Sequence, residues 1–376
     1  VFSVLRILHL ADMHLGYRPG NSNVPANLFE QRDRVLEQAV QVAMERDVNL
    51  FLIAGDLFDD YRPPEQLVEE TIRSLKRLEQ HGVLVVTVPG NHDEYTYPES
   101  VYRRQKDRWP GILVTNPMPE IVYSNSVGGE QVHIVSMAYI AGQTDASSPL
   151  KDFPARPETG MTLAVLHGTV GGWQQNERSL PLDEKALADS GYDYIALGHL
   201  HTNKQYEWKA CYPGMVAGKG FADPGVGYFT LVTLDNAGAR VEKIPAENVP
   251  VWHREEISVS EYDNYDTLVE DCQQRLKQRA GSPTQIVLKG FADFPISTER
   301  LKTDVGDYSV YLEVVDETQG FSDEFIDRLA REKTIRGLFV RKMKQRIDQA
   351  EDEEKRRLYR SSLIFGLEAL GIGGDD

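Results

Sequence analysis

Five short polar motifs in this sequence carry histidine, carboxylate and amide side chains at spacings that suit metal binding. They are Asp12-Met13-His14, Gly55-Asp56, Gly90-Asn91-His92-Asp93, His167-Gly168 and Gly198-His199-Leu200-His201. Residues two apart in extended backbone point to the same side, so the Asp-x-His and His-x-His pairs can each offer two ligands to one place. Imidazole, carboxylate and amide donors without a thiolate suit Mn²⁺, Fe²⁺ or Zn²⁺.

The number of these donors indicates more than one ion. Together they exceed what a single ion needs, and two ions that share one carboxylate would use them economically. Paired ions about 3.5 to 4 Å apart suit in-line attack on phosphorus. The chemistry that these residues predict is therefore the hydrolysis of a phosphate ester.

The motifs follow apolar runs of strand length. Strands are expected over Leu5–Leu10, Leu50–Ala54, Leu84–Val88, Val132–Met137, Met161–Leu166, Tyr194–Leu197 and Tyr228–Leu234. Apolar residues at spacings of three and four predict helices over Arg32–Arg46 and Glu65–Gln80. This alternation predicts a layered α/β core whose sheet is covered on both sides. Open α/β sheets place their ligands at the carboxyl ends of strands, where these motifs fall.

Single residues in and around the motifs have simpler roles. The glycines beside the polar residues allow sharp turns and close backbone approach; they are Gly55, Gly90, Gly168 and Gly198. His9 and His133 lie inside expected strands, so we interpret them as structural.

The pattern changes after the last of these strands. It breaks around Pro245–Pro250, and a small α+β domain is expected over 253–320, with a helix at Asp266–Arg279 and strands at Gln285–Lys289 and Ser309–Val315. A charged helical tail is expected over 322–370, with an apolar stripe that contains Ile335, Leu338, Phe339, Met343 and Ile347. This tail is either a solvated helix docked on its own domain or a docking helix for a partner.

Composition narrows the class of protein. The 376 residues include 58 acidic and 41 basic side chains, which gives a net charge of −17. Such a surface repels polyanions, so contact with nucleic acid needs bound cations or a local basic patch. The run that contains Arg103, Arg104, Lys106 and Arg108 is either such a patch or a solvated surface. Only two cysteines occur, which excludes a disulfide scaffold. The sequence shows neither a signal peptide nor a membrane span, and a cytoplasmic location is expected.

The motif series resembles that of the calcineurin-like metallophosphoesterases. The longer strings His9–Gly16 and Gly55–Asp59, the following Arg62-Pro63-Pro64, and Tyr212-Pro213-Gly214 are similar to the SbcD-type nuclease subunits of DNA double-strand-break repair. Met215 stands where that family usually has Ser. The resemblance covers about residues 5 to 235. It implies a metallophosphoesterase β-sandwich flanked by helices over 1–245, a capping domain over 253–320 and a partner-binding helical tail over 322–370.

The resemblance also implies a ligand set. One metal would be held by Asp12, His14, Asp56 and His201, and the other by Asp56, Asn91, His167 and His199, with Mn²⁺ as the expected metal. His92 would stabilise the transition state or protonate the leaving oxygen, and Asp93 would orient its ring. Asp59 stands where many archaeal and eukaryotic relatives have a second catalytic histidine.

By the same resemblance, the substrate would be DNA. The implied activity is a 3′-to-5′ exonuclease and endonuclease, in a homodimer formed through helices such as Glu65–Gln80 and tuned by an SbcC-type coiled-coil ATPase. One alternative is another metallophosphoesterase that acts on a small phosphodiester or phosphomonoester. Protein phosphatases usually have Gly-Asn-His-Glu where Asp93 stands here. A non-catalytic scaffold is disfavoured because every ligand position is intact.

Overall fold

The computed structural model describes residues 4–20, 23–140, 149–171, 178–292, 294 and 296–370. The chain divides into two compact units, Val1–Val251 and Trp252–Asp376. The finer division into three parts, at the boundaries expected from the sequence, stays a prediction.

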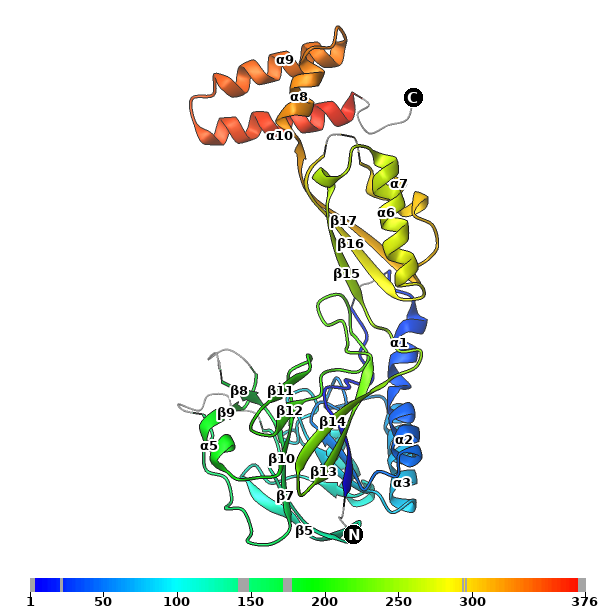
Figure 1. Ribbon diagram of the computed structural model, residues 1–376, viewed down its shortest axis with the longest axis vertical. Coiled ribbons are helices and arrows are strands. Elements are labelled where there is room, and N and C mark those ends of the chain that lie inside the picture. Colours follow the sequence, from blue (N-terminus) through cyan, green and yellow to red (C-terminus); the bar gives the residue numbers. More distant parts are fainter. Residues whose placement is uncertain are drawn as a thin grey trace. The chain divides into compact units, whose positions relative to one another are not determined.

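The first unit contains two six-stranded sheets (Figure 1). The first sheet has the strand order β14-β13-β1-β2-β3-β4. Its members are β1 (Leu5–Leu10), β2 (Leu50–Ala54), β3 (Leu84–Val88), β4 (Ile112–Leu113), β13 (Tyr228–Asp235) and β14 (Gly238–Pro245). Strands β1 to β4 are parallel neighbours, and β13 pairs antiparallel with β1. Because the first three strands are parallel, the motifs that follow them leave the sheet at the same edge.

The second sheet has the order β11-β12-β10-β7-β6-β5. Its members are β5 (Glu120–Val127), β6 (Glu130–Ser136), β7 (Met161–His167), β10 (Tyr194–Gly198), β11 (Lys204–Tyr206) and β12 (Ala210–Tyr212). Strands β6, β7 and β10 run parallel to one another. His167 and the Gly198-to-His201 motif are therefore placed at the carboxyl edge of this sheet.

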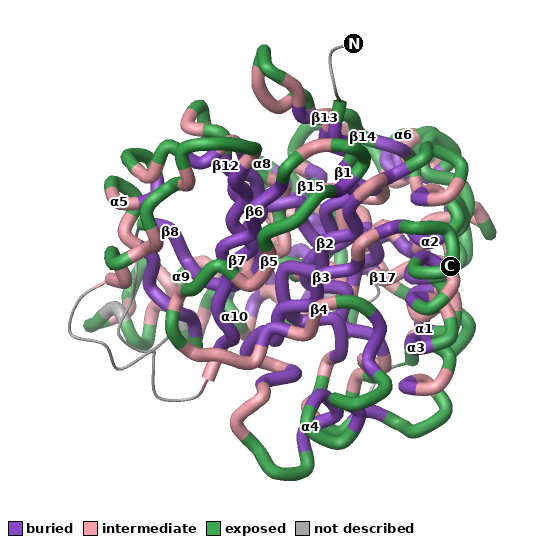
Figure 2. The backbone as a smooth tube through the Cα atoms, turned by 90° about the horizontal axis from the view of Figure 1, so that it is seen from below, coloured by how far each residue is buried: buried purple, intermediate pink, exposed green. Residues whose placement is uncertain are grey.

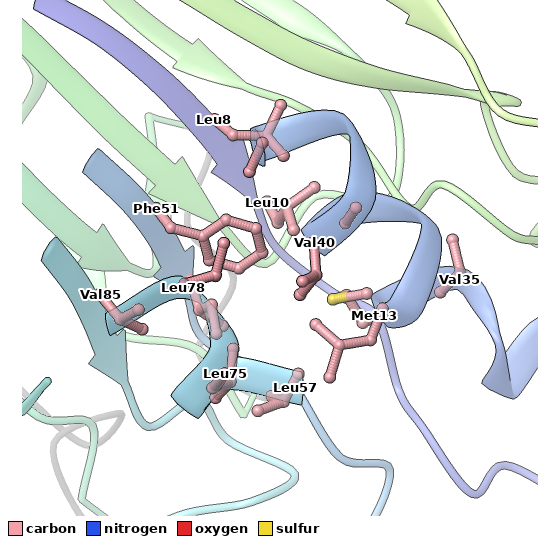
Figure 3. Close-up of a cluster of buried hydrophobic side chains, with 14 of the residues drawn as sticks. Leu8, Leu10, Met13, Val35, Val40, Phe51, Leu57, Leu75, Leu78 and Val85 are labelled. Carbon is pink, nitrogen blue, oxygen red and sulfur yellow. The ribbon is translucent and has the colours of Figure 1, made fainter. Parts of the chain in front are cut away.

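Alternating side chains explain why the first sheet is buried on both faces. Leu8 and Phe51 belong to the apolar cluster formed with helices α2 (Val35–Glu45) and α3 (Glu65–Gln80), as Figure 3 shows. Ile7 and its neighbours on the opposite face pack against the second sheet. The period of two in a strand produces this division. In Figure 2 the central strands β2, β3 and β7 are accordingly buried along almost their whole length.

The far face of the second sheet has its own cover. A third apolar cluster joins strands β7 and β10 to α5 (Glu184–Asp189) and to the short pair β8 (Thr169–Val170) and β9 (Pro181–Leu182). The first unit is thus a two-sheet sandwich flanked by helices, which confirms the fold class expected from the sequence.

One predicted helix is wrong in its extent. The periodic stretch Arg32–Arg46 includes the end of α1 (Ala26–Asp33) and the whole of α2, and the two helices meet at Arg34. The guanidinium of Arg32 is fully buried and donates hydrogen bonds to the carbonyl oxygens of Met13, at 2.6 Å, and His14. Arg32 therefore turns into the fold toward the first polar motif.

The second unit begins with a parallel three-stranded sheet formed by β15 (His253–Ser258), β16 (Pro283–Ala292) and β17 (Tyr311–Phe321). Helices α6 (Tyr265–Gln278) and α7 (Thr298–Asp304) supply apolar residues to the core of this sheet.

The charged tail forms three helices, α8 (Asp323–Ala330), α9 (Ile335–Asp348) and α10 (Glu353–Ala369), around a separate small core. The predicted apolar stripe is divided, because Met343 is buried in that core whereas Ile335 and Leu338 are exposed. No helix among the described residues is long and apolar enough to cross a membrane.

Candidate dinuclear metal centre

The motifs follow their strands through tight turns, in which several residues other than glycine have positive φ values. Asp12, His14, Asp56 and His199 have φ values of 53°, 44°, 50° and 107°. For a residue other than glycine, this left-handed conformation costs about 1–3 kcal/mol. Such strained residues are most often found at functional sites. Two backbone bonds between neighbouring loops fix the turns: Asp12 N donates to Gly55 O at 3.1 Å, and His14 N donates to Asp56 O at 2.9 Å.

Two glycines let the sheets approach each other beneath the site. A Cβ atom on Gly198 would lie 1.7 Å from the carbonyl oxygen of Ala54, and one on Gly55 would lie 2.1 Å from Nδ1 of His167. The space is needed because His167 Nδ1 lies 2.8 Å from the same Ala54 oxygen. Since a carbonyl oxygen only accepts, Nδ1 carries a hydrogen, and Nε2 is the nitrogen that could bind a cation once it has given up its own proton.

The first group of predicted ligands is Asp12, His14 and His201, whose ligand atoms all lie within 4.8 Å of one another. The two imidazole Nε2 atoms are 3.2 Å apart. The backbone N–H of His199 donates to both carboxylate oxygens of Asp12, at 3.0 and 3.1 Å. These residues come from opposite ends of the first unit, and the two sheets bring them together.

The second group contains Asp12, Asp56 and His167, again within 4.8 Å. Asp56 Oδ2 lies 3.5 Å from Nε2 of His167 and 3.7 Å from Nε2 of His14, so this carboxylate stands between the two groups. The amide oxygen of Asn91 lies 3.0 Å from both His167 Nε2 and His199 Nδ1. All seven predicted metal ligands therefore converge in the structure.

The charges of these groups suit a bound cation. Burial lowers the pKa values of His14 and His199 to about 3, so both imidazoles are neutral at pH 7, as ligands must be. Burial also raises the pKa of Asp12. Burial opposes charge on Asp56 and His167 as well. Their mutual attraction overcomes this, because the pKa of Asp56 is held well below its ordinary value and that of His167 is raised to about 9. Without a metal, His167 is therefore protonated at pH 7, and a cation bound there would displace this proton.

Buried carboxylates are stable when they are paired or coordinate a metal. Asp12 and Asp56 are almost fully buried, and oxygen and imidazole donors face one another around them. This donor set fits divalent cations of the Mn²⁺, Fe²⁺ and Zn²⁺ type.

His92 stands at the open side of the site. Its side chain is 38% exposed, and its ring packs edge-on against His14 with the centroids 4.6 Å apart. Nδ1 of His92 lies 3.1 Å from the carbonyl oxygen of Asp59, and its backbone N–H donates to Asp56 Oδ1 at 2.9 Å. The ring is therefore oriented by the backbone of Asp59.

Asp93 has a different set of contacts from the one expected. Its carboxylate accepts hydrogen bonds from Gly90 N at 2.8 Å, from Phe58 N at 3.1 Å and from the Tyr102 hydroxyl at 2.7 Å. None of the described hydrogen bonds of this carboxylate reaches the His92 ring. Asp93 ties the third motif to the second one, which fixes the loop on which His92 stands.

Comparison with known proteins agrees with this geometry. A family model described as calcineurin-like phosphoesterase matches residues 5–203, more than half of the chain and the whole run of motifs. The chain belongs to the calcineurin-like phosphoesterase family. Dinuclear metal sites are typical of this family, so the convergent ligands have a ready interpretation.

Three curated relatives show how far the likeness extends. An uncharacterized metallophosphoesterase, YhaO of Bacillus subtilis, is 26% identical over 86% of this chain and 80% of its own length. The DNA double-strand break repair protein Mre11 of Methanopyrus kandleri is 26% identical over 80% of this chain and 68% of its own length. The protein of the same name from Sulfolobus acidocaldarius is 26% identical over 54% of this chain, which spans half of that relative.

Two outer carboxylates hold the imidazole ligands of this phosphoesterase. His201 Nδ1 lies 2.8 Å from Asp223 Oδ1, and His14 Nδ1 lies 3.1 Å from Asp59 Oδ1. Lys219 Nζ lies 2.8 Å from the same oxygen of Asp59. Such carboxylate partners fix the tautomer and orientation of metal-binding histidines. Asp59 thus contacts a predicted ligand, at the position where the resemblance implies a histidine in many relatives.

Sequence reasoning missed Asp223, Lys219 and the buried Arg32. Asp223 and Lys219 lie in the coil between β12 and β13 and belong to no motif. The one available signal was the similarity of Tyr212-Pro213-Gly214 to the family pattern, which marked the neighbouring segment. Arg32 lies on the buried face of α1 with Leu28 and Phe29, and no local pattern indicates that an arginine is buried there.

Most arginines of the basic run after the third motif pair with nearby side chains of the same unit. Arg108 forms a two-point ion pair with Glu69, at 2.6 Å for both contacts, and Arg104 pairs with Glu65 at 2.5 Å. The guanidinium of Arg103 lies over the ring of Tyr95, 4.6 Å from its centroid. For Arg104 and Arg108 the structure favours the solvated-surface interpretation.

Proposed function

We propose that this phosphoesterase is a metal-dependent DNA nuclease, with 3′-to-5′ exonuclease and endonuclease activity, that acts in double-strand-break repair. The observation that carries the proposal is the Methanopyrus match. It extends over 333 residues, well beyond the 5–203 segment that the family model covers. A phosphatase that shares only the metal centre would not require likeness in the second unit. That relative is named as a DNA double-strand break repair protein.

In this proposal the converging side chains hold two divalent ions, for which Mn²⁺ is our choice. Asp12, His14 and His201 hold one ion, and Asn91, His167 and His199 hold the other, with Asp56 between them. When bound, the ions supply Lewis-acid polarisation of the scissile phosphate. Because the net charge is −17, cations that neutralise this acidic site would favour contact with DNA.

His92 is our candidate for the general acid. Its Nδ1 faces the carbonyl oxygen of Asp59 at 3.1 Å, so Nδ1 carries a hydrogen and Nε2 is the nitrogen that can exchange a proton. The side chain is 38% exposed, whereas those of His14 and His167 are fully buried, and this exposure lets His92 reach a substrate. A proton placed on the leaving oxygen by such a group is worth about 10²–10⁴-fold in rate.

We further propose that the protein works with an SbcC-type coiled-coil ATPase, bound by the tail, and as a homodimer. Support for the first comes from apolar side chains exposed on the tail helices. They include Ile335, Leu358 and Phe365, which are 78%, 62% and 70% exposed. For the homodimer, α3 can offer only its polar outer face, because Val68, Ile72 and Leu75 are buried in the core of the first unit.

Nuclease assays with Mn²⁺ test this proposal. The substrates are linear duplex, hairpin and single-stranded DNA, together with bis(4-nitrophenyl) phosphate as a generic phosphodiester. The wild-type chain should cleave DNA, and an Asp56→Asn variant purified identically should not, which controls for contaminating nucleases. Turnover of the generic ester without DNA cleavage would instead support the alternative, a phosphoesterase that acts on small substrates.

A further inference from the structure

A buried carboxylate next to the third motif connects an exposed arginine with an exposed aromatic segment. Glu94 follows the Gly-Asn-His-Asp motif and has no exposed surface. Its Oε1 lies 3.2 Å from Nη2 of Arg178, and its Oε2 accepts a hydrogen bond from the Thr96 hydroxyl at 2.8 Å. The residue after Thr96 is Tyr97, which is 38% exposed. The buried carboxylate of Glu94 therefore holds both the guanidinium of Arg178 and the segment that leads into Tyr97.

Arg178 lies directly against a predicted metal ligand. Its Nη2 also donates to the carbonyl oxygen of Asn91 at 3.2 Å, and the amide of Asn91 contacts two of the imidazoles. The side chain nevertheless remains 68% exposed. Both described contacts use the same nitrogen, and a guanidinium has five N–H donors in a planar fork. The outward donors are suited to two-point contact with a phosphate.

Tyr97 is supported from behind by a second tyrosine. The rings of Tyr61 and Tyr97 have centroids 4.5 Å apart, with an angle of 38° between their planes. Both backbones are anchored at the start of α4 (Val101–Gln105), where Val101 N donates to Tyr61 O and Ser100 N donates to Tyr97 O. The inner face of Tyr97 is thus covered and its position fixed, whereas its exposed part is open to a planar ligand.

This aromatic pair lies close to His92. Tyr61 is two residues from Asp59, whose carbonyl oxygen contacts the His92 ring, and two residues of chain span at most ~7 Å. The described surface beside His92 therefore combines an exposed cation with an exposed, supported aromatic ring. Positive groups that follow the backbone, and aromatic rings on which bases stack, are the two components of single-strand binding sites.

We propose that Tyr97 and Arg178 form a nucleotide subsite at the edge of the metal centre. Tyr97 stacks on the base of a nucleotide next to the scissile phosphate, and Arg178 contacts a flanking phosphate. The inference rests on the proposed nuclease function and narrows its substrate to nucleic acid with an unstacked base at the cleavage point.

Kinetics on paired substrates test the subsite. The substrates are a single-stranded oligonucleotide and the same strand with abasic residues at its terminal positions. Tyr97→Ala should raise KM on the intact strand about tenfold, with a small effect on kcat and none on the abasic strand. Tyr97→Phe should behave as wild type. Arg178→Ala should raise KM on both strands, because both carry the phosphates. Phe291→Ala, at an exposed aromatic of the second unit, is the control for general loss of surface aromatic area.

A binding experiment separates failure of the subsite from failure of the nuclease proposal. An oligonucleotide with a terminal 2-aminopurine should lose fluorescence on binding to the wild-type chain in Mn²⁺, because stacking quenches that base. Tyr97→Ala should abolish the quenching and Tyr97→Phe should keep it. Equal KM values for Tyr97→Ala and wild type on the intact strand would overturn the subsite. So would equal losses on the two strands, or absence of quenching by the wild type. Quenching without cleavage would support the subsite and overturn the nuclease.

Discussion

The Nε2 atoms of His14 and His201 lie 3.2 Å apart, and each ring has its Nδ1 beside a carboxylate. A carboxylate only accepts hydrogen bonds, so His201 Nδ1 carries a hydrogen. When both rings are neutral and carry their hydrogen on Nδ1, the two Nε2 lone pairs face each other. Two facing lone pairs repel unless a cation or proton lies between them. This relationship, together with Asp56 between the two ligand groups, is the strongest structural support for a metal centre.

Loss of the outer carboxylate should weaken metal binding. Asp59→Asn removes the charge that lies beside both His14 and Lys219, and we expect about 10–100-fold weaker Mn²⁺ affinity by calorimetric titration. Asp60→Asn is the matched control, because Asp60 is the exposed neighbour whose carboxylate accepts from Arg62 N. Equal affinities in the two variants would show that Asp59 does not support the ligand.

His92→Ala should separate catalysis from metal binding. We expect DNA cleavage to fall by about 10²–10⁴-fold, because the leaving oxygen loses its proton donor. Calorimetric titration should still give Mn²⁺ binding close to that of the wild type, since His92 is outside the predicted ligand set. A clean preparation of the variant that cleaves DNA at the wild-type rate would refute the assigned role.

Gly198→Ala should destabilise the first unit. Its Cβ would lie 1.7 Å from the Ala54 carbonyl oxygen, which is backbone and cannot rotate away. Overpacking of this kind costs about 1–3 kcal/mol, and occasionally more, and urea unfolding measures the loss. Gly220→Ala is the control, because a Cβ added there would meet no atom of the described residues within 4 Å. Similar unfolding midpoints for the two variants would contradict the close packing of the sheets.

His9 should make stability depend on pH. This buried side chain has its Nδ1 2.9 Å from the Tyr194 hydroxyl, and burial lowers its pKa from 6.5 to about 3. Below pH 6.5 His9 is protonated in the unfolded chain but stays neutral in the folded chain. The free energy of unfolding therefore falls as the pH drops from 6.5 toward 3.

Between pH 7 and pH 5, the free energy of unfolding should fall by roughly 2 kcal/mol less in His9→Gln than in the wild type. Urea unfolding at the two pH values measures the difference. Parallel losses in the two proteins would mean that His9 is protonated in the fold.

The predictability of the fold followed the strength of the local patterns. The bounds predicted for β1, β2 and β3 agree with the structure, because strands buried on both faces are rich in apolar residues and stand out in the sequence. Strands β5 and β14 were missed because both are edge strands with many exposed polar residues. The helix break at Arg34 was missed because no glycine or proline marks it.

The residues of the site were likewise predictable only where a local pattern marks them. The predicted metal ligands were visible because each belongs to a short motif at the end of a strand. Arg178, Lys219 and Asp223 act through contacts with residues far away in the sequence, and no local spacing indicates such contacts. The contacts of Asp93 could not be predicted either, since Tyr102 and Phe58 reach it only after the loops have folded together.

The number of Mn²⁺ ions that each chain binds is the decisive measurement for the dinuclear centre. Calorimetric titration of metal-free protein, checked by elemental analysis, should give about two ions per wild-type chain. The Asp56→Asn chain should bind fewer than one Mn²⁺ ion with an affinity comparable to that of the wild type, because Asp56 lies between the two ligand groups. A wild-type chain that binds no Mn²⁺, or an Asp56→Asn chain that still binds two ions as tightly, would contradict the dinuclear centre.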